Sequence, residues 1–494
     1  MSDRPFRLHD TLTGKVKELI PLEPRHLKFY SCGPTVYSYA HIGNFRSFLT
    51  ADLVVRTAKA IGWDVTWVSN ITDVGHLTMD DMADAGGEDK LEGALRSKEG
   101  ERFHNVWELA EYYAAAYLED WQRLNLTEPD IRPKATQHVR EQILAAESLI
   151  KSGHAYETSS GVYFSVESRP DYGKLSGNTD RESLIRGARD VVTDETKRDP
   201  ADFAIWKKDE KHLMQWFSPY GWGFPGWHIE CSVMARAYLG DTLDLHSGGE
   251  DNIFPHHECE IAQSEALTGK PFANHWLHTR FLLVNGEKMS KSKGNFFTVR
   301  DLLSQGTHPL ALRYALISGV YSKQLNFTLQ TLEDAKRHVQ RFEKALQLAE
   351  SAQGDGPNVF GDSLDDLYDQ ALEAMLNDLN TAVALAKSIE GAKQITKESE
   401  LNAASGEAAA RFLDQINRLL GIVNSDYEAV AVKVEEAKPE PKADAAWVEA
   451  KIAERAAAKK AKDFALADAI RKEVTEAGVV LQDHPDGTTT WSVD

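Results

Sequence analysis

The sequence predicts an α/β protein with a Rossmann-like, doubly wound parallel sheet that carries an insertion, followed by an α-helical bundle and a small C-terminal α+β unit. Strand-like and helical segments alternate near the N-terminus and again after residue 225, which is the pattern of a parallel sheet. Between these two regions the alternation stops and turn residues are frequent. Beyond residue 309 helical periodicity dominates.

These observations divide the chain into six parts. The expected halves of the sheet are residues 1–128 and 225–308, separated by an insertion at 129–224. A helical region at 309–433, a charged and proline-bearing linker at 434–446 and a terminal unit at 447–494 complete the chain.

The composition is that of a soluble protein. The chain has 494 residues, of which 42% are hydrophobic and 27% charged. It shows no long apolar run and no signal-peptide core, so we expect a cytoplasmic protein without a membrane span. Three cysteines argue against a disulfide framework. The net charge of −20 disfavours binding to nucleic acid unless Lys and Arg gather on one face.

A β-α-β unit is expected to open the sheet. It consists of a strand at Leu27–Ser31, a helix at Phe45–Ala60 and a strand at Asp64–Ser69. The motif His41-Ile42-Gly43-Asn44 falls at the N-terminus of that helix. Free N–H groups and the positive end of the helix dipole favour phosphate at this position.

The next elements surround the insertion. A helix is expected at Arg102–Leu126, a second at Val139–Ser152, and a hairpin around Gly161. We expect the sheet to resume with strands at Trp227–Cys231 and Asp244–His246.

A helix and a hairpin then complete the second half of the sheet. The helix is expected at Pro255–Thr268, because proline suits the first helical turn. The strand Phe281–Val284 ends at Asn285-Gly286, a strong hairpin signal.

Two long helices are predicted in the helical region, at Leu332–Ser351 and Leu364–Ile389. Leu376, Leu379 and Val383 would share one face of the second.

The terminal unit is expected to contain two helices and one strand. These lie at Lys451–Ala461, Phe464–Ala477 and Val479–Leu481.

The loop Lys288-Met289-Ser290-Lys291-Ser292 directly follows the predicted hairpin. Its ammonium groups can balance the charge that develops as pyrophosphate leaves, and its hydroxyls can donate hydrogen bonds. A lysine-rich loop alone is also typical of a solvated turn. The His41 motif upstream favours a nucleotide site.

Four potential metal ligands are spread over the two halves of the sheet. Cys32 and Cys231 are expected at strand ends, while His256 and Glu260 share one face of a predicted helix. Two thiolates, an imidazole and a carboxylate suit zinc. Distant cysteines are also typical of packing residues, and a His/Glu pair is typical of a helix surface, so spacing alone leaves both interpretations open.

The neighbouring residues favour no other metal motif. Cys259 points elsewhere on the helix and is expected to pack in the core. His257-Glu258 does not begin a His-Glu-x-x-His motif, because residue 261 is Ile, which disfavours a metalloprotease.

Several stretches of the chain resemble the cysteinyl-tRNA synthetases, a family of class I aminoacyl-tRNA synthetases. The most specific are the runs at 32–37 (Cys-Gly-Pro-Thr-Val-Tyr) and 226–231 (Gly-Trp-His-Ile-Glu-Cys). Further matches lie at 41–44, 70–73, 199–203, 246–260, 288–295, 324–328 and 462–489. The resemblance therefore covers nearly the whole chain.

The resemblance implies that the protein activates L-cysteine with ATP and transfers it to cysteine tRNA. The ligands Cys32, Cys231, His256 and Glu260 would hold one Zn²⁺ that binds the substrate sulfur, and Mg²⁺ would accompany ATP. Zinc prefers a soft thiolate to the hydroxyl of serine, so no editing domain is expected. The resemblance further implies a monomer.

The resemblance also implies the remaining site residues. His41, Asn44, Lys288 and Lys291 would act in catalysis. The ATP site would comprise His41, Gly43, Asn44, Gly248, Gly249, Asp251, Lys288, Ser290, Lys291 and Ser292. Thr72, Trp227 and His246 would line the amino-acid pocket, although each is also typical of a packed residue.

The tRNA would be held by the C-terminal half of the chain. Residues Leu332–Asn424 would dock its inner corner, and the terminal unit would read the anticodon. Lys459, Lys460, Lys462 and Arg471 supply positive charge there. Phe464 is expected to pack with Ala467, Ile470 and Val474 on one helix face rather than to stack on a base.

Two positions depart from the family pattern. The first motif ends in Asn44 where many members have His, and an amide carries no charge. The stretch Asn70–Asp73 continues as Val74-Gly75-His76-Leu77 instead of an acidic sequence.

Two alternative functions remain. A ligase that joins cysteine to an amino-sugar, as in mycothiol synthesis, would share the zinc and ATP motifs and lack the C-terminal tRNA-binding parts. A non-catalytic RNA-binding paralogue would not need the intact lysine motif and ligand set.

Overall fold

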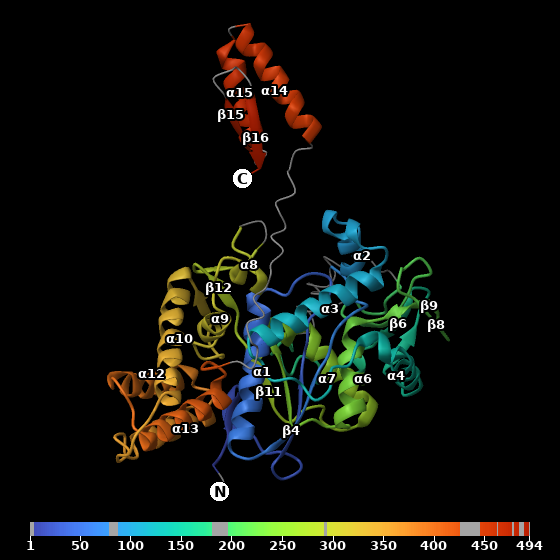
Figure 1. Ribbon diagram of the computed structural model, residues 1–494. Helices are drawn as coiled ribbons and strands as arrows, with labels where there is room; N and C mark the ends of the chain where they lie inside the picture. Colours follow the sequence, from blue (N-terminus) through green and yellow to red (C-terminus); the bar gives the residue numbers. More distant parts are fainter. Residues whose placement is uncertain are drawn as a thin grey trace. The chain divides into compact units, whose positions relative to one another are not determined.

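The computed structural model describes residues 4–78, 87–179, 196–290, 294–424, 445–461, 463–476, 479–483 and 489–493. They form two compact units, Met1–Tyr427 and Glu428–Asp494. In the first unit a central sheet lies between the insertion, with β6, β8 and β9, and the helical bundle, with α10, α12 and α13 (Figure 1).

The central sheet is parallel and doubly wound, as the sequence predicts. Its strands are β3 (His26–Ser31), β4 (Asp64–Ser69), β10 (Leu245–Gly249) and β11 (Trp276–Thr279), in the order β11-β10-β3-β4. All neighbouring pairs are parallel. The strand order reverses between β3 and β10, so a crevice opens at their carboxyl ends, where ligands bind in this fold.

The helix that follows β3 begins at the first signature motif. It is α1 (Ile42–Ala60), with His41 as its N-cap. Helix α3 (Val106–Arg123) is shorter than predicted at both ends, and α2 (Lys90–Leu95) precedes it. A hairpin of β1 (Arg7–Asp10) and β2 (Lys15–Glu18) lies ahead of the sheet.

The prediction of a strand at Trp227–Cys231 is wrong. These residues open helix α6 (Trp227–Leu239). Residues 228–235 are all buried and only residues 236–238 near the end of the helix are exposed, so its first two turns show no amphipathic period in the sequence.

The predicted helix at Pro255–Thr268 is regular only from Glu258. Residues Ile253–His257 form an irregular π-type turn in which Phe254 is extended, and α7 (Glu258–Thr268) follows. His256 therefore lies on the turn and Glu260 on the helix.

The insertion contains a five-stranded antiparallel sheet of order β5-β6-β7-β9-β8. Its strands are β5 (Ala155–Glu157), β6 (Gly161–Phe164), β7 (Phe203–Lys208), β8 (Trp216–Ser218) and β9 (Gly221–Pro225), and α4 (Val139–Lys151) packs on it. The hairpin predicted around Gly161 is confirmed as β5–β6. The core of the insertion includes Ile229 and Cys259, so it is continuous with α6 and α7.

A small sheet carries the lysine loop. It pairs β12 (Leu282–Val284) with β13 (Glu287–Lys288) and with β14 (Leu325–Phe327). The Asn285-Gly286 turn lies between β12 and β13 as predicted, and both residues have positive φ. Short 3-10 turns lie at Lys98–Arg102, Ala135–His138, Val166–Ser168 and Glu250–Asn252.

The helical region comprises α8 (Val299–Ser304), α9 (Pro309–Leu316), α10 (Leu329–Glu350), α11 (Ser363–Leu376), α12 (Thr381–Lys397) and α13 (Ala403–Leu420). The prediction of one helix at Leu364–Ile389 is wrong, because Asp378 and Leu379 adopt positive φ and divide it into α11 and α12. Asp378 is held there by the N-terminal strand, since its backbone N–H donates to the Arg7 carbonyl. Val383 is consequently 42% exposed, whereas Leu376 and Leu379 are buried.

The second unit contains α14 (Ala445–Lys460), α15 (Phe464–Glu476) and the antiparallel strands β15 (Val479–Asp483) and β16 (Thr489–Val493). Ala467, Ile470 and Val474 are buried on one face of α15, as predicted. The side chain of Phe464 and most of the predicted linker lie outside the described residues.

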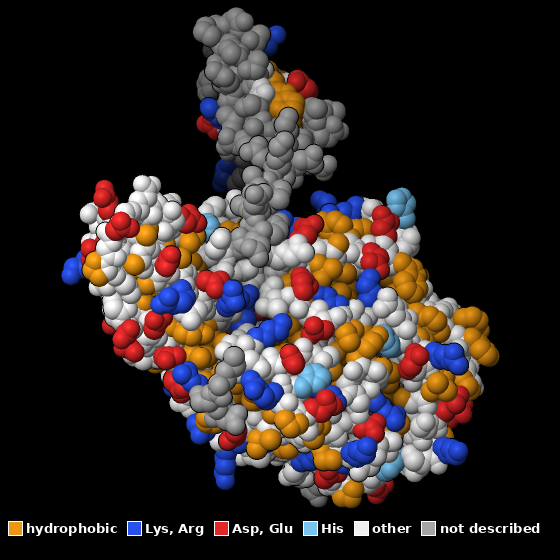
Figure 2. Space-filling view, turned by 60° about the horizontal axis from the view of Figure 1, so that its bottom comes forward, with side chains coloured by type: hydrophobic (Ala, Val, Ile, Leu, Met, Phe, Trp, Pro, Cys, Tyr) orange, Lys and Arg blue, Asp and Glu red, His pale blue; other side chains and the backbone are white. Residues whose placement is uncertain are grey.

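None of the described helices is both long enough and apolar enough to cross a membrane. On the face of the molecule seen in Figure 2, Lys and Arg side chains are interspersed with Asp and Glu side chains.

Candidate active site

The four predicted metal ligands meet at the crevice between β3 and β10. Their donor atoms all lie within 4.8 Å of one another. The Cys32 and Cys231 Sγ atoms are 4.0 Å apart, Cys231 Sγ is 3.6 Å from His256 Nε2, and that nitrogen is 3.0 Å from Glu260 Oε1. Ligand atoms of a tetrahedral zinc ion are separated by about 3.3 to 3.8 Å, so this donor set fits a metal ion.

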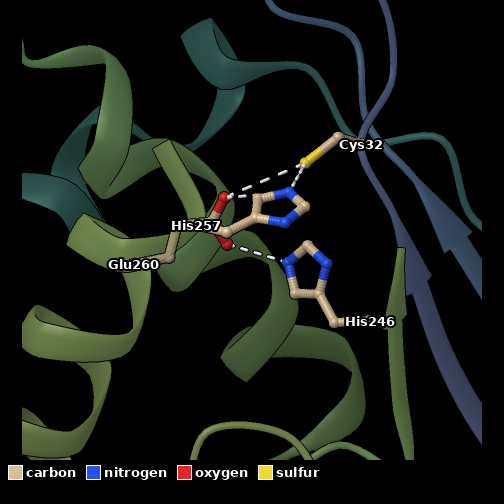
Figure 3. A group of neighbouring side chains, drawn as sticks. All are labelled: Cys32, His246, His257 and Glu260. Atoms are coloured by element: carbon tan, nitrogen blue, oxygen red, sulfur yellow. Dashed lines mark hydrogen bonds and ion pairs between the residues drawn. The ribbon is translucent and has the colours of Figure 1, made fainter. Parts of the chain in front are cut away.

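A second group shares two of these ligands. Cys32 and Glu260 also lie with His246 and His257 within the same 4.8 Å limit. Figure 3 shows the Glu260 carboxylate beside the two imidazoles, with dashed lines to Cys32 at the end of β3 and to His246. Glu260 accepts from His246 Nε2 at 2.8 Å, and His257 Nε2 is 3.2 Å from Cys32 Sγ.

The charged groups in the cluster favour an anionic Cys231 and an anionic Glu260. The hydrogen bond from Cys32 lowers the pKa of Cys231 to about 6, which makes Cys231 a thiolate at neutral pH, the form that binds metals. Burial would raise the pKa of Glu260, but His246 and His256 lower it to about 2. Burial disfavours a charged His256, yet the Glu260 carboxylate raises its pKa to about 10. Burial raises the pKa of Cys32 well above its usual value.

Sequence reasoning missed the histidines behind the ligands. His228 Nδ1 lies 3.0 Å from His256 Nδ1, and His257 Nδ1 lies 2.8 Å from His278 Nε2. Burial lowers the pKa values of His257 and His278, the latter to about 3, so these rings are neutral. In the sequence, His228 and His257 lie within three residues of the ligands Cys231 and His256, but the spacing of these histidines does not mark a common site.

Helix α7 is tied to the insertion on its other side. The Glu258 carboxylate accepts from the backbone N–H groups of Leu175 and Ser176 and from the Ser176 hydroxyl. The Cys259 thiol is buried 3.4 Å from the Tyr172 hydroxyl, which confirms its predicted packing role. The ligand-bearing turn of α7 is therefore held from both sides.

The two signature motifs are in contact. His41 and Asn44 form a reciprocal capping box at the start of α1, with Asn44 N donating to His41 Nδ1 and His41 N donating to Asn44 Oδ1, both at 3.1 Å. A Cβ atom on Gly43 would lie 2.7 Å from the terminal methyl group of Met289, so the Met289 side chain of the lysine loop lies directly against the start of α1. Asn44 thus stabilises the helix start while its Nδ2 atom remains a donor.

The described part of the lysine loop is braced from its far end. Asn295 accepts from the Ser290 N–H at 2.8 Å, and the Lys288 ammonium lies 4.2 Å from the centre of the Phe281 ring. His41 packs edge-on against Phe296. Lys291 and Ser292 lie outside the described residues.

The other predicted site residues surround the metal-ligand group. Thr72 is buried beside β3, its N–H donating to the Pro34 carbonyl at 3.0 Å. Trp227 stacks on His256, with ring centres 4.1 Å apart, and His246 stacks on Trp276.

The predicted adenosine-binding residues follow the end of β10. Gly248 lies against His257, and a Cβ atom on Gly249 would meet the Asp251 carboxylate at 2.3 Å. The site residues within the described part of the chain therefore converge on one edge of the sheet.

Comparisons with known proteins agree with this geometry. Residues 18–337 match the family model "tRNA synthetases class I (C) catalytic domain". A cysteine–tRNA ligase from Salinibacter ruber is 54% identical over 99% of this chain and 98% of its own length. One from Chlorobaculum tepidum is 41% identical over 99% of both chains.

Solved structures share the fold at low identity. Mycobacterium tuberculosis methionyl-tRNA synthetase with methionyl-adenylate has a TM-score of 0.55 at 15% identity, covering 80% of this chain and 92% of that chain. Agrobacterium radiobacter LeuRS in a ternary complex with tRNA and LeuAMS has a TM-score of 0.59 at 10% identity, covering 81% and 85%. The chain therefore belongs to the class I tRNA synthetases and, within them, to the cysteine–tRNA ligase family.

Proposed function

We propose that this protein is a cysteine–tRNA ligase that activates L-cysteine with ATP and transfers the cysteinyl group to the 3′ end of cysteine tRNA. One observation supports this most strongly: a buried, thiolate-bearing metal-ligand group lies at the same sheet edge as two signature motifs in mutual contact. The relatives with full-length matches carry the same name. The amino-sugar ligase is not favoured.

The metal is proposed to be Zn²⁺, one per chain, held by Cys32, Cys231, His256 and Glu260. Zinc supplies a soft Lewis acid that binds the substrate thiolate, which serine lacks. The alternative group of His246 and His257 with Cys32 and Glu260 contains one sulfur donor instead of two. The set with both cysteines is preferred because zinc favours soft thiolate ligands, and this set contains two sulfur atoms and an imidazole.

ATP is proposed to bind along the contact of the two motifs, accompanied by Mg²⁺. His41, Gly43, Asn44, Ser290 and Ser292 would contact the phosphates. Lys288 and Lys291 would balance the charge that grows as the cysteine carboxylate attacks the α-phosphate and pyrophosphate departs. Gly248, Gly249 and Asp251 would hold the adenosine.

The amino-acid pocket is proposed to be lined by Thr72, Trp227 and His246. Trp227 and His246 each stack on a neighbouring ring in the metal-ligand group or sheet, so their positions are restricted.

The remaining parts are proposed to bind tRNA. We assign 129–224 as the connective insertion, 309–433 as the region that docks the inner corner, and 447–494 as the anticodon-binding unit. A monomer is sufficient for this arrangement.

Charging of a cysteine tRNA transcript tests the function. We expect cysteine-dependent pyrophosphate exchange and formation of cysteinyl-tRNA. Exchange without charging would favour the amino-sugar ligase, and the absence of exchange would favour a non-catalytic paralogue.

Metal analysis tests the zinc proposal. We expect one zinc per chain, lost in Cys231→Ser and retained in the matched control Cys259→Ser, whose thiol is also buried. Full activity in a zinc-free preparation would contradict the sulfur-binding mechanism.

A further inference from the structure

The Gly75-His76 pair lies against the proposed amino-acid pocket. Gly75 has a φ of +77°, and a Cβ atom there would approach the Pro225 carbonyl oxygen to 2.7 Å. Only glycine therefore allows the chain to turn this close to the segment that leads into Trp227. The turn directs the buried His76 side chain toward α6.

His76 and His256 enclose Trp227. The His76 and Trp227 rings are nearly parallel, with centres 4.0 Å apart and planes inclined by 11°. His256 stacks on the same indole, with ring centres 4.1 Å apart and planes inclined by 28°. Two imidazoles therefore restrict the rotation of one indole, and one of those imidazoles is a potential metal ligand.

Hydrogen bonds at both ring nitrogens fix the orientation of His76. Its Nε2 atom lies 2.6 Å from the Lys90 ammonium, which can only donate, so Nε2 accepts. Nδ1 then carries the proton and donates to Thr35 Oγ1 at 2.7 Å. Thr35 forms a bridge with Thr72, another proposed pocket residue.

We propose that His76 is a positioning residue for the amino-acid pocket: it holds Trp227 against His256 and links the indole, through Thr35, to the segment after β4 that contains Thr72. This inference rests on the proposed function. It adds the residue that fixes the position of Trp227 in the proposed cysteine pocket. Lys90 and Thr35 orient the ring, and the ring orients the indole.

Kinetics of cysteine-dependent pyrophosphate exchange test the role in binding. His76→Ala should raise the KM for cysteine about 2- to 12-fold, because an aromatic pair contributes about 0.5–1.5 kcal/mol and 1.4 kcal/mol is tenfold. The KM for ATP should stay unchanged. His76→Phe, which keeps the stacked ring, should recover most of the loss, whereas His76→Asn should not.

A mutant cycle and a surface control sharpen the result. In a Trp227→Leu background, His76→Ala should cause no further rise in the KM for cysteine. His104→Ala serves as the control, since that side chain is 87% exposed. Equal rises in the KM for cysteine and for ATP, or no recovery in His76→Phe, would overturn the proposal.

A spectroscopic measurement separates this inference from the proposed function. In protein labelled with 5-fluorotryptophan, the resonance absent from Trp227→Phe identifies Trp227 among the eleven Trp residues. His76→Ala should shift that ¹⁹F resonance and leave the others in place. An unchanged Trp227 resonance would refute the positioning role of His76 even if the protein activates cysteine. If the wild-type protein fails to activate cysteine, the proposed function falls, and the ¹⁹F shift still decides the role of His76.

Discussion

A buried ion pair joins the catalytic sheet to the helical region, and its removal should strongly destabilise the first unit. Arg313 on α9 and Asp52 on α1 are both fully buried, with Arg313 Nη2 2.5 Å from Asp52 Oδ2. The same guanidinium donates to the carbonyls of Leu420, Leu124 and Asn125 at 2.8 to 3.0 Å. It thereby satisfies the C-terminal ends of α13 and α3.

The magnitude follows from the charge that would be left behind. Asp52→Ala leaves the Arg313 guanidinium buried with neutral carbonyl partners only, and breaking a buried pair in this way costs about 3–5 kcal/mol. The double variant Asp52→Ala/Arg313→Met removes the fully buried unpaired charge, while the other partner of Asp52, Arg56, is 12% exposed, so the double variant should be more stable than Asp52→Ala alone.

The pH dependence provides a second estimate. Burial would raise the pKa of Asp52, but Arg56 and Arg313 lower it from 3.8 to about 2. The lowered pKa stabilises the folded state by about 2 kcal/mol at neutral pH. Because the folded value lies below the unfolded one, this stabilisation is present above about pH 4 and is lost as the pH falls toward 2.

Urea unfolding, followed by intrinsic fluorescence at pH 7 and at pH values down to 2, measures these effects. Asp414→Ala is the matched control, because Asp414 pairs with Arg418 on the surface, with side-chain exposures of 55% and 79%. We expect the control to lie within about 0.5 kcal/mol of the wild type. If Asp52→Ala destabilises no more than Asp414→Ala, the reasoning on the buried pair is refuted.

Three further predictions concern other parts of the first unit. Arg46 is buried and donates to the Phe281, Val320 and Lys323 carbonyls, which flank the sheet that carries the lysine loop. Arg46→Lys should therefore misplace the loop and lower kcat for adenylate formation about 10²-fold, with zinc content unchanged. An unaltered kcat would contradict this role. Gly391→Ala should destabilise the helical region by about 1–3 kcal/mol, as measured by urea unfolding, because the added methyl group would lie 2.3 Å from the Phe412 ring. A stability equal to that of the wild type would show that the ring can move aside. Burial lowers the pKa of His275 to about 4, so as the pH falls the unfolded chain protonates this residue before the folded protein does, and stability should decrease between pH 6.5 and 4. His275→Gln should reduce this dependence of stability on pH, whereas His104→Gln, at an exposed position, should leave it unchanged. Unfolding midpoints measured across this pH range test the prediction.

Local chemistry explains which elements could be predicted. The Asn285-Gly286 turn and the start of α1 depend on neighbouring residues, so they are visible in sequence. The α11–α12 break is not, because Asp378 and Leu379 adopt positive φ where the N-terminal strand binds the chain. Helix α6 was missed for a related reason: residues buried on every side carry no helical period.

The sequence by itself determined the parallel sheet, the two signature motifs and the residue types of a thiolate-rich metal site. Only the tertiary structure brought Cys32 and Cys231, 199 positions apart, to 4.0 Å and placed His76 flat against Trp227. The difference has a physical origin. Backbone propensities and turn chemistry act between neighbours, whereas a metal-ligand group at a sheet switch point depends on how strands and helices distant in the chain pack together.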